Sequence, residues 1–344
     1  MSIGITVPTK AVYRLETLKA VDEGDGPGEA APYLWVVYFK LDGDTMNWRV
    51  SRDGSEFGLT LEGTPVVSVP AGGHGNLGVS EAGKTVDAGE TLPIPGSVGE
   101  WRSVLRPLPI RSDRDLSLVL PDGTPIETSS AFAGFVALFL EEDAVSNDTI
   151  LEAHAVFEKE SRTALSDLTS GLSIDLTPFI TQGQVPTPEQ ALALVVQQVD
   201  LGAVAQQILE SVDETVRDVV MAQVLVPIAA AFLAGNPSLF GVSLVNADVD
   251  DLIGGAVIVL SQDQLAQGRT FWGWKSPLPV PVEHPADVVF EGGGEDGSWE
   301  FAGRAFSIDV TSLAANLELA GFDPANGVRQ AVGTGSVQEW IEES

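Results

Sequence analysis

The sequence predicts an α+β fold, with β-sandwich-like antiparallel sheets and a helical segment inserted between N-terminal and C-terminal strands. Three observations support this fold class. Residues 1 to about 140 alternate short apolar segments with clusters of Gly, Pro and Asp, which favour turns. Residues from about 148 to 235 place apolar side chains at helical spacing. Strand-like segments return after Asn236.

This pattern divides the chain into three parts. We expect an N-terminal β-rich domain at 1–147, a helical segment at 148–235, and C-terminal strands with a short helical tail at 236–344. In one interpretation the C-terminal strands return to the N-terminal sheet. In the other, separate β domains flank a helical one. A chain of 344 residues is long enough for either arrangement.

The N-terminal strands are predicted from short runs of large apolar residues. Two of them contain a segment, 33–39 in one and 135–140 in the other, that is apolar on both faces, which is typical of a central strand covered on both sides. The full set of expected strands is Ala11–Leu18, Tyr33–Leu41, Asn47–Val50, Pro65–Val69, Trp101–Leu105, Leu116–Leu120 and Phe132–Leu140.

The helical segment begins at a run of capping residues, 146–148, and its first helix continues to about Leu168. Residues 188–235 indicate one long or two shorter helices, with Gly202 and Pro227 as breaks or kinks. The C-terminal part then predicts strands at 256–260, 270–274 and 299–310, and helices near Leu313 and around Ser336–Ile341.

The most apolar run, 219–235, is shorter than a membrane-spanning helix and contains Gln223 and Pro227. We therefore expect a buried core helix there and no constitutive membrane span. The N-terminus lacks the basic start and apolar run of a signal peptide. This predicts a cytoplasmic protein, or one exported by a non-classical route.

The charge balance argues against nucleic-acid binding. The chain has 18 Lys and Arg against 49 Asp and Glu, a formal net charge of −31. Phosphate backbones need Lys and Arg to neutralise them, so DNA and RNA would be repelled. Two explanations of the acidity stay open: calcium binding, and solubility in a high-salt habitat. The chain contains no cysteine, which excludes disulfides, zinc–thiolate sites and cysteine nucleophiles.

Two acidic loops are the best candidates for a metal site, because each directly follows a strand that is apolar on both faces. Calcium prefers six to eight oxygen ligands and tolerates irregular geometry. If the two strands are neighbours, we expect both loops to lie at one end of the sheet. The candidate ligands are Asp42, Asp44, Glu141, Glu142, Asp143 and Asp148.

This arrangement resembles that of calcium-dependent C2-type sandwiches, in which loops at one rim hold the ion, although no stretch of the chain matches a motif of that family. The competing interpretation is that the carboxylates simply end the strands. Acidic loops at 22–29 and 291–298 depart from the alternating pattern of an EF-hand, and the aspartates at 248–251 are expected to form a helix cap or turn.

The sequence contains few candidates for a catalytic or sugar-binding site. His74 lies in a glycine-rich stretch that we expect to be a flexible loop, and His154 pairs with Glu158 on the surface of the first helix. No zinc-hydrolase motif and no serine-hydrolase elbow occur. Carboxylates are abundant, and three tryptophans are candidates for stacking on sugars: Trp272, Trp274 and Trp299.

The sequence therefore favours a non-enzymatic binding or structural module, with calcium as its candidate ion and an unidentified protein or glycan as its partner. The first alternative is a carbohydrate-active hydrolase. The second is an assembly-forming or membrane-damaging protein whose helices repack, and oligomers are expected in that case.

Overall fold

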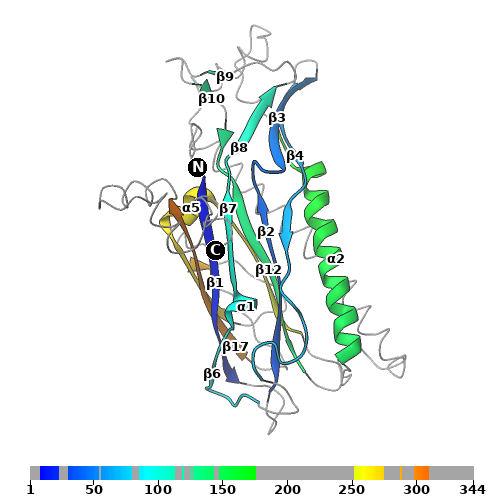
Figure 1. Cartoon of the computed structure of the whole chain (residues 1–344), viewed down its shortest axis with the longest axis vertical. Coiled ribbons are helices and arrows are strands. Elements are labelled where there is room, and N and C mark those ends of the chain that lie inside the picture. Colours follow the sequence, from blue (N-terminus) through cyan, green and yellow to red (C-terminus); the bar gives the residue numbers. More distant parts are fainter. Residues whose placement is uncertain are drawn as a thin grey trace, which may run out of the picture.

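The computed structural model describes the parts of the chain that form most of the predicted sheets and the first long helix (Figure 1). The described residues are 8–22, 30–53, 56–79, 85–112, 118–119, 125–126, 128–142, 147–175, 252–274, 287–288 and 298–309. Most of these residues form antiparallel β-sheets, and three helices accompany them.

The strands before residue 142 match the predicted order, with several additions. They are β1 (Thr9–Asp22), β2 (Pro32–Leu41), β3 (Met46–Asp53), β4 (Glu56–Gly63), β5 (Val66–Ser68), β6 (Thr91–Pro93), β7 (Glu100–Leu105), β8 (Leu108–Ser112), β9 (Leu118–Val119), β10 (Pro125–Ile126), β11 (Thr128–Ser129) and β12 (Phe132–Glu141). Five of these strands were not predicted: β4 and β8, whose apolar pattern is interrupted by polar or proline residues, and the short strands β6, β10 and β11.

The later elements are α2 (Asn147–Gly171), β13 (Ser173–Asp175), β14 (Leu252–Ser261), α5 (Gln262–Gln267), β15 (Arg269–Trp274), β16 (Asp287–Val288) and β17 (Ser298–Asp309); a single helical turn, α1 (Gly96–Gly99), precedes β7. The prediction of a helix at about 148–168 is therefore confirmed. The predicted helices between 188 and 235 and those of the tail lie outside the described residues, as do residues 23–29, 248–251 and 291–297 of the acidic loops.

The central sheet has the strand order β14-β12-β2-β5, and all its pairings are antiparallel. In the β2–β12 pairing, Leu41 lies opposite Phe132 and Pro32 lies opposite Glu141. Every residue of β2 and of β12 is buried. Both strands are thus central and covered on both faces, as predicted.

A second sheet, which we call the β1 sheet, has the order β16-β15-β17-β1-β6, and β7 pairs with β1 beside β6. Its longest pairing joins β1 to β17, from Thr9 opposite Asp309 to Asp22 opposite Ser298, with two shifts of register along the way. C-terminal residues therefore return to an N-terminal sheet. A third sheet, β11-β8-β3-β4-β13, contains the parallel pair β3–β8.

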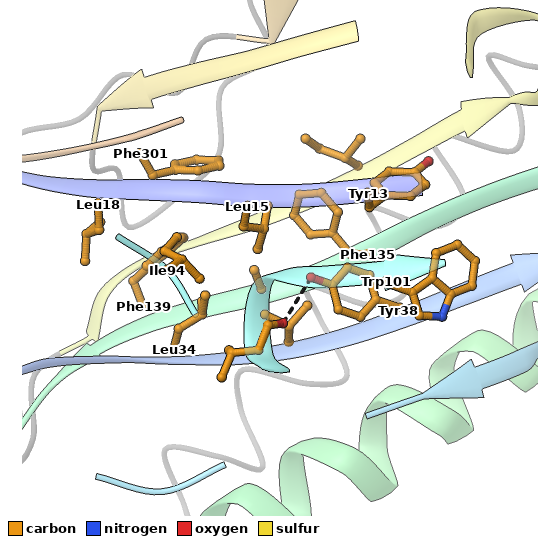
Figure 2. Packing of buried hydrophobic residues seen from close by; sticks show 14 of the residues in the cluster. Tyr13, Leu15, Leu18, Leu34, Tyr38, Ile94, Trp101, Phe135, Phe139 and Phe301 are labelled. Carbon is orange, nitrogen blue, oxygen red and sulfur yellow. Dashed lines mark hydrogen bonds between the residues drawn. The ribbon is translucent and has the colours of Figure 1, made fainter. Parts of the chain in front are cut away.

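A hydrophobic core cluster contains residues of both the β1 sheet and the central sheet (Figure 2). Tyr38 of β2 stacks on Trp101 of β7 with ring centroids 5.8 Å apart, and Tyr13 of β1 meets Phe135 of β12 edge-on at 5.9 Å. The buried Tyr13 hydroxyl donates a hydrogen bond to the Ala133 carbonyl at 2.6 Å. Aromatic packing and a satisfied hydroxyl thus join the two sheets.

The helix α2 covers the other face of the central sheet, where Figure 1 shows it running alongside β2 and β4. The Trp35 ring lies 5.8 Å from that of Phe157 on α2, and both side chains are fully buried. Both faces of β2 take part in packing: Leu34, Val36 and Tyr38 belong to the core cluster, and Trp35 faces α2. Within the described residues, no helix combines the length and apolar character needed to cross a membrane.

Candidate functional site

The predicted acidic turn after β2 forms a charge-paired cluster with two cations. We call this cluster the Lys40 network; it consists of Lys40, Asp42, Asp44 and Arg106. The Lys40 ammonium donates to Asp42 Oδ2 at 2.8 Å, to Asp44 Oδ2 at 2.6 Å and to the Val104 carbonyl at 3.0 Å. These three bonds use all three donors of a lysine ammonium.

Arg106 completes the network from the loop between β7 and β8. Its guanidinium donates to Asp44 Oδ1 at 2.7 Å, and its backbone N–H donates to Asp42 Oδ2 at 3.0 Å. Both oxygens of Asp44 therefore accept from a cation. Two positive and two negative side chains neutralise each other, so a metal ion at this turn would have to displace Lys40.

Burial raises the pKa of both aspartate carboxyl groups, whereas pairing with Lys40 and Arg106 lowers it. Asp42 is fully buried, and this burial raises its pKa, although Lys40 and the Arg106 N–H offset part of the effect. For Asp44, burial also favours the neutral form, but hydrogen bonds and charge from Lys40 and Arg106 outweigh it and lower the pKa. The network therefore stabilises ionised Asp44 near the surface and desolvates Asp42 beneath it.

Gly43 allows the turn to approach the β7–β8 loop. Its N–H donates to the Arg106 carbonyl at 2.9 Å, and a Cβ at this position would collide with the Pro107 carbonyl oxygen. The glycine of the D-G-D sequence is thus explained by the close approach of two backbone segments. The two aspartates beside it are explained by their hydrogen bonds with Lys40 and Arg106.

The second predicted loop lies at the opposite end of the sheet. Because β2 and β12 are antiparallel, the chain leaves β2 after Leu41 and leaves β12 after Glu141 at opposite ends. A strand of this length spans roughly 30 Å. The expectation that both loops share one rim is therefore wrong: it took account of strand adjacency but not of strand direction.

The remaining candidate ligands are placed as follows. Glu141 ends β12 and is buried, Glu142 follows it, and Asp148 lies in the first turn of α2; Asp143 is outside the described residues. The described residues contain no group of three or more His, Asp or Glu side chains placed to hold a metal ion. The metal role of these residues stays a prediction.

Two histidines that the sequence did not connect lie along one face of β2. His74 contacts Glu142, with Nδ1 3.2 Å from Oε1, and its ring lies 5.1 Å from that of Tyr33. The His154 ring lies 5.3 Å from that of Trp35. Tyr33 and Trp35 are themselves 5.8 Å apart, so a row of rings connects the loop at 72–78 to α2.

His154 is therefore not the surface partner of Glu158 that helical spacing predicted. It packs against Trp35 and against Gly72, where a Cβ would collide with the imidazole ring, and Glu158 pairs with Arg162 at 2.9 Å instead. The loop at 72–78 is held in place as well. Asn76 bonds both the N–H and the carbonyl of Leu34, which satisfies part of the edge of β2.

Trp299 is not available for a sugar. It is 1% exposed and belongs to the core cluster between the two sheets, so the structure corrects its assignment as a stacking platform. The side chains of Trp272 and Trp274 lie outside the described part of the chain. His74 and Glu142 form the best-placed imidazole–carboxylate pair, which links the loop at 72–78 to the end of β12.

Comparison with known proteins adds no family to this picture. The chain matches no protein-family model, and no curated protein or solved structure matches it. Function must therefore be inferred from the residues themselves.

Replacing Lys40 by Met should lower the free energy of unfolding by about 3–5 kcal/mol, because it leaves the buried Asp42 carboxylate without its cation. Chemical denaturation measures the change. The matched control is Lys159→Met, whose ammonium is 75% exposed and 2.7 Å from Glu160. Its loss should cost no more than about 1 kcal/mol. Equal effects in the two variants would show that the Lys40 network is not buried in solution.

His154 should make stability depend on pH. Burial lowers its pKa below the ordinary 6.5, and the charge of Glu158 only partly offsets this. The unfolded chain therefore binds a proton at a higher pH than the folded one. This contribution to stability is complete above pH 6.5 and is lost as the pH falls from there through the folded-state pKa.

His154→Phe keeps a ring against Trp35 and Phe157 but cannot titrate. We expect its unfolding free energy to fall less steeply than that of the wild type as the pH is lowered from about 7.5 to 5.5. Urea denaturation at each pH measures both slopes. Parallel slopes would mean that His154 is solvated in the folded protein.

Proposed function

We propose that this chain is a non-enzymatic structural or binding module, built as a sandwich-like pair of sheets with a helical segment inserted between N-terminal and C-terminal strands. In this proposal it acts through its surfaces. The supporting observation concerns polar side chains in the described part of the chain: several of them join two parts of the fold.

Three such groups illustrate the point. The Lys40 network joins the β2–β3 turn to the β7–β8 loop. Asn76 joins the loop at 72–78 to Leu34 of β2. Gln262 donates to Thr9 Oγ1 at 3.0 Å and accepts from the Ala131 N–H at 3.3 Å, which joins α5 to both sheets. Side chains that serve as internal connections are committed to the fold and are poorly placed to act on a substrate.

Calcium remains part of the proposal at one loop only. The turn after β2 carries its own cations, so we assign the calcium role to the loop at 141–148, where carboxylates follow β12 and begin α2. There a divalent ion would offset local negative charge on a chain that carries −31 overall. Its effect would be to neutralise these carboxylates so that a protein or glycan partner can bind there.

The enzymatic alternative predicts turnover, whereas our proposal predicts at most stoichiometric binding. We expect that incubation of the protein with a panel of polysaccharides releases no reducing ends. Affinity electrophoresis in gels that contain the same polysaccharides measures whether the protein binds them. Release of reducing ends that disappears in Glu142→Gln, a substitution in the best-placed histidine–carboxylate pair, would overturn the proposal in favour of a hydrolase.

Millimolar calcium should raise the melting temperature more than equal magnesium, because calcium accepts the irregular oxygen geometry of a loop. The calcium-specific increment should vanish in Asp148→Asn and persist in Asp44→Asn, which alters the cation-paired turn at the other end of the sheet. Scanning calorimetry at constant ionic strength measures both. The assignment to the loop at 141–148 would be ruled out if calcium gave no specific rise in melting temperature, or if Asp44→Asn removed that rise.

A further inference from the structure

The outward face of the β1 sheet concentrates positive charge on an acidic protein. Strand alternation turns Ala11, Tyr13 and Leu15 into the core and places Lys10 and Arg14 on the opposite side of β1, where Val12 between them is buried. We call this outward surface the basic face. Its described charged side chains are Lys10, Arg14 and Lys19 of β1, Arg102 of β7, Arg304 of β17, and the carboxylates Glu16, Glu100 and Glu300.

The carboxylates of this face are shared among its cations. Glu100 contacts both Arg14, at 3.1 Å, and Arg102. Arg304 lies 2.7 Å from Glu16, and the pairing register sets it directly opposite Arg14. Like charges that face each other across a strand pair repel unless counter-charges intervene. The face thus holds five cations around three carboxylates.

The rest of the chain has the opposite character. Because the whole chain carries −31 and the basic face contributes five positive charges against three negative ones, the residues outside this face sum to −33. The crowding of cations has a local effect as well. Burial and the nearby Arg102 charge both lower the pKa of Lys10.

An exposed apolar side chain accompanies the charges. Ile308 of β17 lies opposite Lys10 in the register and is 40% exposed, one of three large hydrophobic side chains exposed among the described residues. An exposed apolar side chain on a surface that carries Arg is a common composition for a protein–protein interface, where Arg is enriched.

We propose that the basic face docks on the acidic surface of a second copy of this chain. This inference rests on the proposed non-enzymatic role and names the surface and the partner. The contact joins two different surfaces, so it is head-to-tail and leads to rings or filaments rather than to a closed two-fold dimer. The second copy is favoured as the occupant because its own composition supplies the complementary charge.

Salt should promote this contact. Two chains at −31 repel each other over a Debye length of about 10 Å at 0.1 M salt, and this length shrinks to about 3 Å at 1 M. Ion pairs within a desolvated contact are screened much less. Association should therefore strengthen from low to high salt.

Sedimentation velocity across this salt range tests the proposal, with Arg304→Gln as the variant and Arg49→Gln as the control. The two arginines are matched: Arg304 is 49% exposed beside Glu16 at 41%, and Arg49 is 49% exposed beside Glu62 at 43%, in a different sheet. We expect Arg304→Gln to weaken association roughly tenfold and Arg49→Gln to leave it unchanged. Arg102→Gln provides a second variant on the same face.

Three results would overturn the inference. These are a monomer at every salt concentration, equal effects of Arg304→Gln and Arg49→Gln, and binding of a polyanion such as heparin through Arg304 without self-association. A monomer would leave the proposed non-enzymatic role intact, because that role fails only if the polysaccharide assay detects turnover. The two failures are therefore distinguishable.

Discussion

The burial of both faces of β2 and β12 is the constraint on which the rest of the structure depends. Two neighbouring strands without a single exposed residue need cover on both sides. The β1 sheet covers one side through Tyr13 and Trp101, and α2 covers the other through Phe157. The layered order follows from the apolar character of two ten-residue segments.

A charged side chain buried among such strands needs an oppositely charged partner, and Lys40 is an example. Lys40 is 6% exposed, and its neighbours on β2 are apolar. An unpaired ammonium there would be strongly destabilising, so the following turn supplies Asp42 and Asp44. The same acidic turn that suggests a metal site is thus explained by the lysine that precedes it.

Much of the fold could be predicted from sequence, because alternation and turn residues are local signals. The central strands β2 and β12, the strands β1 and β17 and the helix α2 all have clear local patterns of apolar residues. No local pattern reveals whether two neighbouring strands run parallel or antiparallel, and for this reason the two acidic loops were expected at one rim. Lys40 was visible as a charge within an apolar strand, but Arg106 comes from a loop 64 residues away from Asp42. No local pattern predicts that contact.

The pairing of β1 with β17 has a consequence for how the chain folds. Thr9 pairs with Asp309, so β1 cannot complete its pairing until one of the last described segments has been synthesised. Such distant contacts slow folding, because the entropy of a very long loop is lost before the pairing forms. Until then, β7 and β6 are the described strands that can pair with β1, and the nascent chain exposes an unpaired edge to other chains.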